Sequence, residues 1–180
     1  FFSLLTRWVW GTALGRPTWH LTRRLFIIIL GLIYFIAFSS LGSQIEGLIG
    51  KEGILPAQNF LQQVESQMGD QRVWKLPTLF WLEAGDGFLK FICLAGAGIS
   101  LLVMAGIAPA LGLFILWLFY LSLFNVGQQF LGFQWDTLLL ETGFLAIFLA
   151  PLKWRPKLAS EPPPSPWVLL LLRFLLFRVM

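Results

Sequence analysis

The sequence predicts an all-α membrane protein, a polytopic transmembrane helical bundle with about five spans, the last of them truncated. Hydrophobic residues make up 57% of the 180 residues and charged residues only 12%, and the mean hydropathy is +0.77. Soluble domains carry roughly 25% charged residues, about twice as many. The chain also contains 18 Phe and 9 Trp, well above the usage of a soluble protein. The bilayer is therefore expected to set the lengths of the helices.

Composition excludes several classes of function. The net charge of +4 does not come from one dense basic run, so we expect no nucleic-acid partner. A single cysteine, Cys93, permits no intrachain disulfide bond. The only histidine, His20, lies far from it in the chain. Because this leaves no ordinary metal site, we expect no metal and no cofactor.

The N-terminal segment is expected to lie along the membrane surface. Residues 1–24 are amphipathic and rich in Trp, which is typical of an interfacial helix. Arg23 and Arg24 then precede an apolar run over about 25–41, which has the length of a first span. The predicted transmembrane domain thus covers residues 25–180.

The only long polar segment, residues 42–87, is predicted to be a structured cap outside the membrane. A connection of this length, with apolar residues every few positions, favours a folded cap over a passive loop. Gly47, Gly50 and Gly53 recur every three residues and are followed by Pro56. This spacing predicts successive tight turns in which the glycines adopt positive φ.

Further spans are predicted at about residues 88–107, 111–130, 134–151 and 167–180. Within the first of these, Gly96 and Ser100 place small residues at i and i+4, which allows two helices to pack closely. A Pro-rich connector, residues 152–166, precedes the last span and is expected to be stiff and extended.

The distribution of Lys and Arg predicts the orientation in the membrane. Basic residues dominate the N-terminal flank and the connector, whereas acidic residues outnumber basic ones in residues 42–87. Cytoplasmic segments carry the excess of Lys and Arg. We therefore expect a cytoplasmic N-terminus and connector, with the cap facing the lumen or periplasm.

Polar residues in the last two predicted spans form a candidate intramembrane network. They are Gln134, Asp136, Glu141, Arg173 and Arg178. A carboxylate in hydrocarbon costs at least a few kcal/mol, so it is expected to be paired, wetted or neutral. Asp136 lies about 140° around the helix from Glu141, so the two do not form a dyad on one face. The pattern fits an internal salt-bridge frame, a polar cavity for a headgroup, lipid or substrate, or a proton relay.

Depth in the membrane selects a partner for Glu141. At about 1.5 Å per residue, Glu141 lies roughly 15 Å above the cytoplasmic end of its span. By the same rise, Arg178 lies roughly 16 Å and Arg173 roughly 9 Å up the next span. We therefore expect Glu141 to pair with Arg178, and with Arg173 as the second choice.

Several ordered sequence blocks resemble those of a known family. The first are Gln44–Ala57 and Pro77–Trp81, which are similar to the signature of the first luminal loop and to the next short block of the lipase maturation factors. The segments Val126–Phe130 and Phe133–Pro151 resemble its central membrane block. Arg173–Arg178 resembles the start of its next span. The likeness covers about residues 25–180, and the family spacing of the blocks makes it specific.

The resemblance implies a polytopic membrane protein without known catalytic residues. In animals the family resides in the endoplasmic reticulum and helps dimeric lipases fold into their active form, and related chains occur in bacteria. We therefore expect a non-catalytic folding or assembly factor for exported or luminal proteins. Its expected partners are membrane lipid and other membrane or exported proteins, and its expected location is a bacterial inner membrane, or the endoplasmic reticulum in a eukaryote.

Two other functions remain open at this point. The first is a structural accessory subunit in stable association with a larger membrane complex, which the abundant Trp and Phe and the lack of catalytic motifs would suit. The second is an integral membrane enzyme, suggested by a more distant likeness to the membrane part of vitamin K-dependent carboxylase. Copurification with a partner at fixed stoichiometry would favour the subunit.

Overall fold

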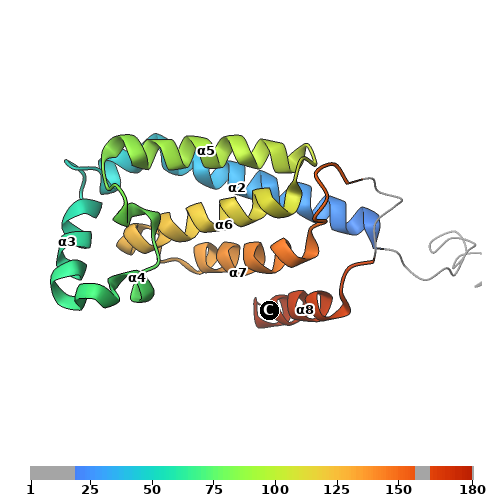
Figure 1. Cartoon of the computed structure of the whole chain (residues 1–180). Coiled ribbons are helices and arrows are strands. Elements are labelled where there is room, and N and C mark those ends of the chain that lie inside the picture. The colour runs from blue at the N-terminus through green and yellow to red at the C-terminus, as the bar shows by residue number, and fades with distance from the viewer. Residues whose placement is uncertain (1–18, 157–162, 180) are drawn as a thin grey trace, which may run out of the picture.

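Helices account for all the regular structure in a computed structural model that describes residues 19–156 and 163–179 (Figure 1). The long helices are α2 (His20–Ile49), α5 (Asp86–Met104), α6 (Pro109–Val126), α7 (Gln134–Leu149) and α8 (Pro166–Val179). The short elements are α3 (Ala57–Met68), η1 (Gly69–Gln71), α4 (Arg72–Lys75), η2 (Leu79–Trp81) and η3 (Gln128–Phe130). The predicted all-helical fold is confirmed. Most of the expected interfacial segment 1–24, and residues 157–162 of the connector, lie outside the described residues.

Three helices, α2, α5 and α6, are long and apolar enough to cross a membrane. With 30 residues, α2 is the longest of them. At about 1.5 Å per residue this gives about 45 Å, more than the ~30 Å thickness of the hydrocarbon core. The helices α7 and α8 are shorter, with 16 and 14 residues. That these two also cross the bilayer stays a prediction.

The C-terminal end of α2 differs from the expectation. The helix does not stop near residue 41 but continues to Ile49, so the connection to the cap begins at Gly50. Polar residues do not end a helix that projects beyond the bilayer, because water solvates their side chains. Glu46, in this projecting part, also pairs with Lys90 of α5, with Nζ 2.6 Å from Oε1.

The glycines of the cap signature also behave differently from the prediction. Gly47 lies inside α2, and none of Gly47, Gly50 and Gly53 has positive φ. Gly50 and Gly53 are instead needed for close packing of the backbone. A Cβ atom at Gly50 would lie 2.5 Å, and one at Gly53 2.8 Å, from the carbonyl oxygen of Glu46. The chain therefore folds back tightly over the end of α2 before Pro56, which directly precedes α3.

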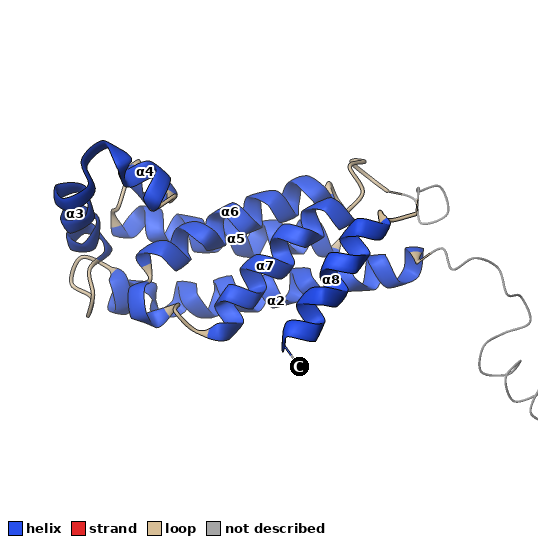
Figure 2. Cartoon of the chain, turned by 90° about the horizontal axis from the view of Figure 1, so that it is seen from below, coloured by secondary structure: helices blue, strands red, loops and turns tan. Residues whose placement is uncertain are grey.

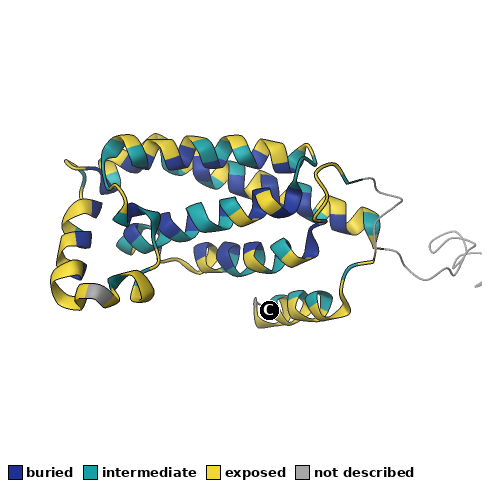
Figure 3. Cartoon of the chain, viewed as in Figure 1, coloured by how far each residue is buried: buried dark blue, intermediate teal, exposed yellow. Residues whose placement is uncertain are grey.

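The bundle is arranged around the pairing of α2 with α5. These two helices run side by side along most of their length, α6 contacts α5 and α7, and α8 lies at the edge against α7 (Figures 1 and 2). The cap helices α3 and α4 sit together at one end of the bundle (Figure 1). Buried positions line the inward faces of α2, α5, α6 and α7, whereas α8 has mostly exposed positions (Figure 3).

Small residues allow the close approach of α2 and α5. A Cβ atom at Gly96 of α5 would lie 2.6 Å from the Phe38 ring of α2. Ser100 is buried one turn further on and donates a hydrogen bond to the carbonyl oxygen of Gly96 (2.7 Å). On the other side of the interface, a Cβ atom at Gly31 would lie 2.9 Å from Met104. In lipid such tight packing takes over the role that water exclusion has in soluble cores.

Candidate functional site

Asp136, in the first turn of α7, is a buried carboxylate with only 4% of its surface exposed. The hydroxyl group of Tyr120, on α6, donates a hydrogen bond of 2.5 Å to its Oδ1 atom. The other oxygen, Oδ2, has no hydrogen-bond partner among the described residues. Because burial makes an unpaired carboxylate oxygen costly, this atom is the clearest candidate for contact with a proton or a bound group.

An aromatic cluster surrounds this hydrogen bond. The rings of Tyr34 and Phe38, both on α2, lie 5.9 and 5.7 Å from the Tyr120 ring in edge-on arrangements. The hydroxyl group of Tyr34 donates a longer hydrogen bond of 3.4 Å to the carbonyl oxygen of Leu139. It also occupies the space where Gly143 of α7 has no side chain, since a Cβ atom there would overlap it. The cluster therefore joins α2, α6 and α7.

A groove of about 490 Å³ opens beside Asp136 between α2 and the start of α7. Its polar lining residues are Ser40, Gln44, Tyr120 and Asp136. The remaining lining is apolar and includes the exposed, stacked rings of Phe133 and Trp135, whose centroids are 4.8 Å apart. An apolar groove with one carboxylate can hold a lipid-like group that carries a hydrogen-bond donor.

Glu141 and Arg178 form a separate polar contact between α7 and α8. The guanidinium group of Arg178 donates a hydrogen bond to Oε2 of Glu141, and the two form an ion pair. This is the pairing expected from depth in the membrane. The contact lies on the side of α7 that faces α8, away from the buried cluster at Asp136.

The five polar residues of the last two predicted spans do not form one network. Gln134 and Arg173 are exposed, and no ion pair of Arg173 occurs among the described residues. Asp136 faces the bundle interior, whereas Glu141 faces α8. The angular separation on α7 explains this division, because positions five residues apart point in different directions.

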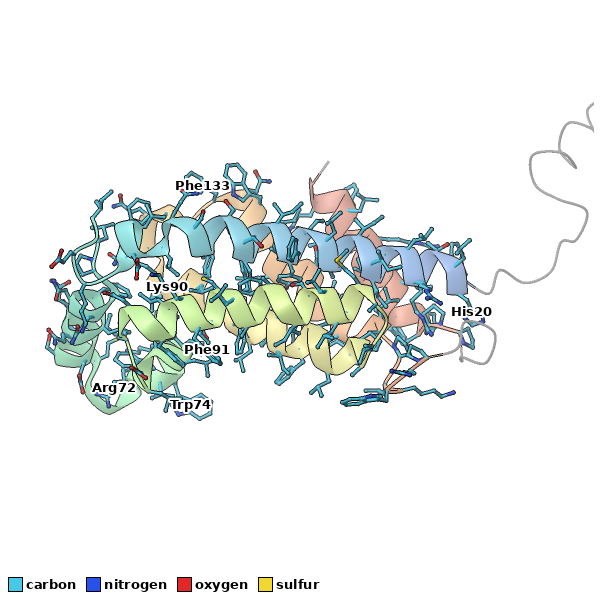
Figure 4. The ribbon with its side chains drawn as sticks, turned by 90° about the horizontal axis from the view of Figure 1, so that it is seen from above. His20, Arg72, Trp74, Lys90, Phe91 and Phe133 are labelled. Atoms are coloured by element: carbon cyan, nitrogen blue, oxygen red, sulfur yellow. The ribbon has the colours of Figure 1, made fainter. Side chains whose placement is uncertain are left out.

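The cap is tied to the bundle by hydrogen bonds from the end of α6 and from η3. The side-chain amide of Asn125 donates to the carbonyl oxygen of Pro77 (2.7 Å), and that of Gln128 donates to the carbonyl oxygen of Leu55 (3.3 Å). Figure 4 shows Lys90 on the stretch of α5 that lies along α2, with Arg72 and Trp74 in the cap beyond it. Three of the sequence blocks that carry the family resemblance thus meet at this junction.

Sequence reasoning missed the two tyrosines. Tyr34 and Tyr120 are the only tyrosines in a chain with 18 Phe, and both occur within apolar runs. A hydroxyl group in such a run usually needs a partner when it is buried, and this signal could have identified them. Across the part of the chain that the structure describes, no group of three or more His, Cys, Asp or Glu could hold a metal ion.

Comparison with known proteins identifies relatives along nearly the whole chain. The family model described as "Lipase maturation factor transmembrane domain" matches residues 21–180. Lipase maturation factor 2 of Xenopus tropicalis is 43% identical over 172 residues, which cover 89% of this chain and 24% of that protein. Lipase maturation factor 1 of Bos taurus is 38% identical over 181 residues, covering 92% of this chain and 32% of that protein.

The human protein named lipase maturation factor 1 is 39% identical over 171 residues, covering 91% of this chain and 30% of that protein. The chain therefore spans a third or less of the length of these relatives. No solved structure matches the chain.

Proposed function

Because the chain belongs to the lipase maturation factor family, we propose that it forms the membrane domain of a non-catalytic folding factor for exported or luminal proteins. The relatives are named for the maturation of lipases, and lipases are the clients we infer here. The proposed location is the membrane at which such clients are delivered. This is the inner membrane in a bacterium and the endoplasmic reticulum in a eukaryote.

The apolar surface of the cap is the observation that carries this proposal. The side chains of Trp74 and Leu82 are 91% and 82% exposed, and those of Ile54 and Val73, also in the cap segment, are exposed as well. Exposed apolar groups outside the bundle are able to contact the apolar segments of an incompletely folded polypeptide. This cap surface, defined as Ile54, Val73, Trp74 and Leu82, is the proposed client contact.

The junction with α6 would hold the cap surface at a constant height above the bundle. The N–H group of Leu79 donates to Oγ of Ser122 (3.1 Å), and the hydroxyl group of Thr78 donates to the carbonyl oxygen of the same residue (3.2 Å). These bonds attach η2, immediately before Leu82, to a membrane helix. A rigid attachment supports presentation of the surface to a client rather than free movement of a linker.

Lipase maturation tests the proposal directly. A lipase and the full-length protein that contains this chain would be expressed together in cells that lack their own maturation factor. We expect Trp74→Ser combined with Leu82→Ser to lower the activity per mass of secreted lipase. Trp154→Ser, which changes another exposed Trp at the opposite end of the bundle, should leave it unchanged.

Lipase activity that does not depend on the full-length protein would contradict the folding-factor role. Equal losses in the cap variant and in Trp154→Ser would contradict the assignment of the cap surface. Purification distinguishes the accessory-subunit alternative, because a subunit retains one partner at fixed stoichiometry whereas a folding factor retains newly made clients transiently.

A further inference from the structure

A pocket of about 280 Å³ lies at the end of the bundle opposite the cap. Its walls are the start of α2, the turn between α5 and α6, and residues 151–156 after α7. Its ionisable lining residues are His20, Arg23, Arg24 and Arg155, and no Asp or Glu of the described ranges, 19–156 and 163–179, lines it. Figure 4 shows His20 at this end of α2. The pocket is therefore strongly positive.

We propose that this pocket binds the phosphate group of an anionic phospholipid headgroup. The planar guanidinium group of arginine stays charged and matches the oxygens of a phosphate with two parallel N–H donors. Arg24 and Arg155 line the pocket, are exposed and can offer such donors. Arg23 is only 7% exposed, so its charge lies at the wall of the pocket rather than in open water.

The backbone adds to this positive field. Helices α2 and α6 both begin at the pocket, through His20 and Pro109. The N-terminus of a helix carries a partial positive charge, which favours bound phosphate. The wall is also fixed, because the N–H group of Ala108 donates a hydrogen bond of 2.8 Å to the carbonyl oxygen of Trp154. The pocket is thus built by the fold and not by mobile side chains alone.

The position of the pocket favours a lipid headgroup, rather than a soluble anion, as its ligand. It lies where α2, α5 and α6 reach one end of their apolar lengths. Exposed tryptophans at the same end, Trp19, Trp154 and Trp167, are typical of the headgroup region of a membrane. Ile27, together with Met104, adds apolar lining beside the arginines. Basic pockets between membrane helices suit lipid headgroups in this way.

Thermal unfolding of the full-length protein in detergent micelles tests the proposal. We expect added phosphatidylglycerol to raise the unfolding midpoint more than the same mole fraction of phosphatidylcholine, because binding to the folded state stabilises it. The double variant Arg24→Gln/Arg155→Gln should lose this difference. Both residues are exposed, so folding should tolerate the change. Arg155→Gln alone, outside every described helix, gives the same comparison if the double variant is not folded.

The matched control is Lys51→Gln/Lys75→Gln, which removes the same charge at the cap end and should retain the full difference. Equal midpoints with the two lipids, or a difference that survives in the arginine variant, would overturn the proposal. A shift of the same size with inorganic phosphate alone would also overturn it, because the site would then bind a soluble anion. Outcomes of this test do not depend on lipase maturation.

Discussion

At the scale of single residues, the hydroxyl group of Tyr120 provides the one hydrogen bond that the structure gives the buried carboxylate of Asp136. The two residues lie on different helices, α6 and α7. Their contact could not be predicted from the sequence, because it depends on how each helix is rotated about its own axis. What the sequence does indicate is that an acid at the start of an apolar span needs a partner.

Tyr120→Phe removes that hydrogen bond while retaining the ring. We expect the free energy of unfolding in detergent to fall by about 1–3 kcal/mol, the usual cost of an unsatisfied buried polar group. Tyr34→Phe is the control, because its hydroxyl group makes only the longer contact of 3.4 Å. No loss of stability in Tyr120→Phe would mean that Asp136 does not depend on this hydrogen bond.

The contact between Glu141 and Arg178 could be predicted from the sequence. Counting helical rise from each end of the spans was sufficient, because both residues lie at similar heights on adjacent helices. The structure does not join the five polar residues into one network. The separation of about 140° between Asp136 and Glu141 around the helix already indicated this, and the two residues face different neighbours.

A double-mutant cycle tests the Glu141–Arg178 pair. Removing one charge leaves the other without its partner in the membrane, so each of Glu141→Gln and Arg178→Gln should destabilise the protein. The double variant should recover part of the loss, and the measurement is unfolding in detergent. Arg173→Gln serves as the control substitution and should not rescue Glu141→Gln. Strictly additive losses in the cycle would exclude an energetic coupling between the two side chains.

At the scale of helices, the sequence predicted the three long apolar helices α2, α5 and α6, because long apolar runs match the thickness of the hydrocarbon core. The helix α2 continues to Ile49, beyond the predicted span, because hydropathy detects where the hydrocarbon ends and not where the helix ends. The cap glycines were misinterpreted because spacing alone does not distinguish positive φ from close contact. Gly50 and Gly53 are restricted by the carbonyl oxygen of Glu46, a contact visible only once the chain is folded.

Gly96 tests the packing of α5 against α2. Gly96→Leu should lower the unfolding free energy by about 1–3 kcal/mol, because a larger side chain cannot fit beside the Phe38 ring. Gly98→Leu is a matched control two residues along the same helix, where a Cβ atom would meet nothing within 4 Å. Thermal unfolding of both variants in detergent gives the comparison. Equal stability of the two would show that this face of α5 contacts lipid instead.

At the scale of the whole molecule, the ends of the bundle differ in charge and in exposed surface. The basic pocket with Arg23, Arg24 and Arg155 occupies one end, and the cap occupies the other. The positive-inside rule then predicts a cytoplasmic basic end and a luminal or periplasmic cap. The client contact and the lipid site would consequently lie on opposite sides of the membrane.

Labelling of single cysteines tests this orientation. We expect Gln67→Cys, at an exposed position in α3, to react with an impermeant thiol reagent added from the lumen or periplasm. Lys153→Cys, at an exposed position of the basic end, should react only after the membrane is permeabilised. The native Cys93 is buried and adds little background. Reaction of Gln67→Cys with reagent added from the cytoplasm would show that the protein has the opposite orientation in the membrane.

The most direct measurement of the central claim is photocrosslinking from the cap surface during export of a lipase. The full-length protein would carry p-benzoylphenylalanine at Trp74, with a matched version at Trp154 of the opposite end. A cap that receives folding clients predicts transient crosslinks to newly made lipase from Trp74 and none from Trp154. Absence of lipase from the Trp74 crosslinks, or a single permanent partner in its place, would contradict the role of this domain in folding exported proteins.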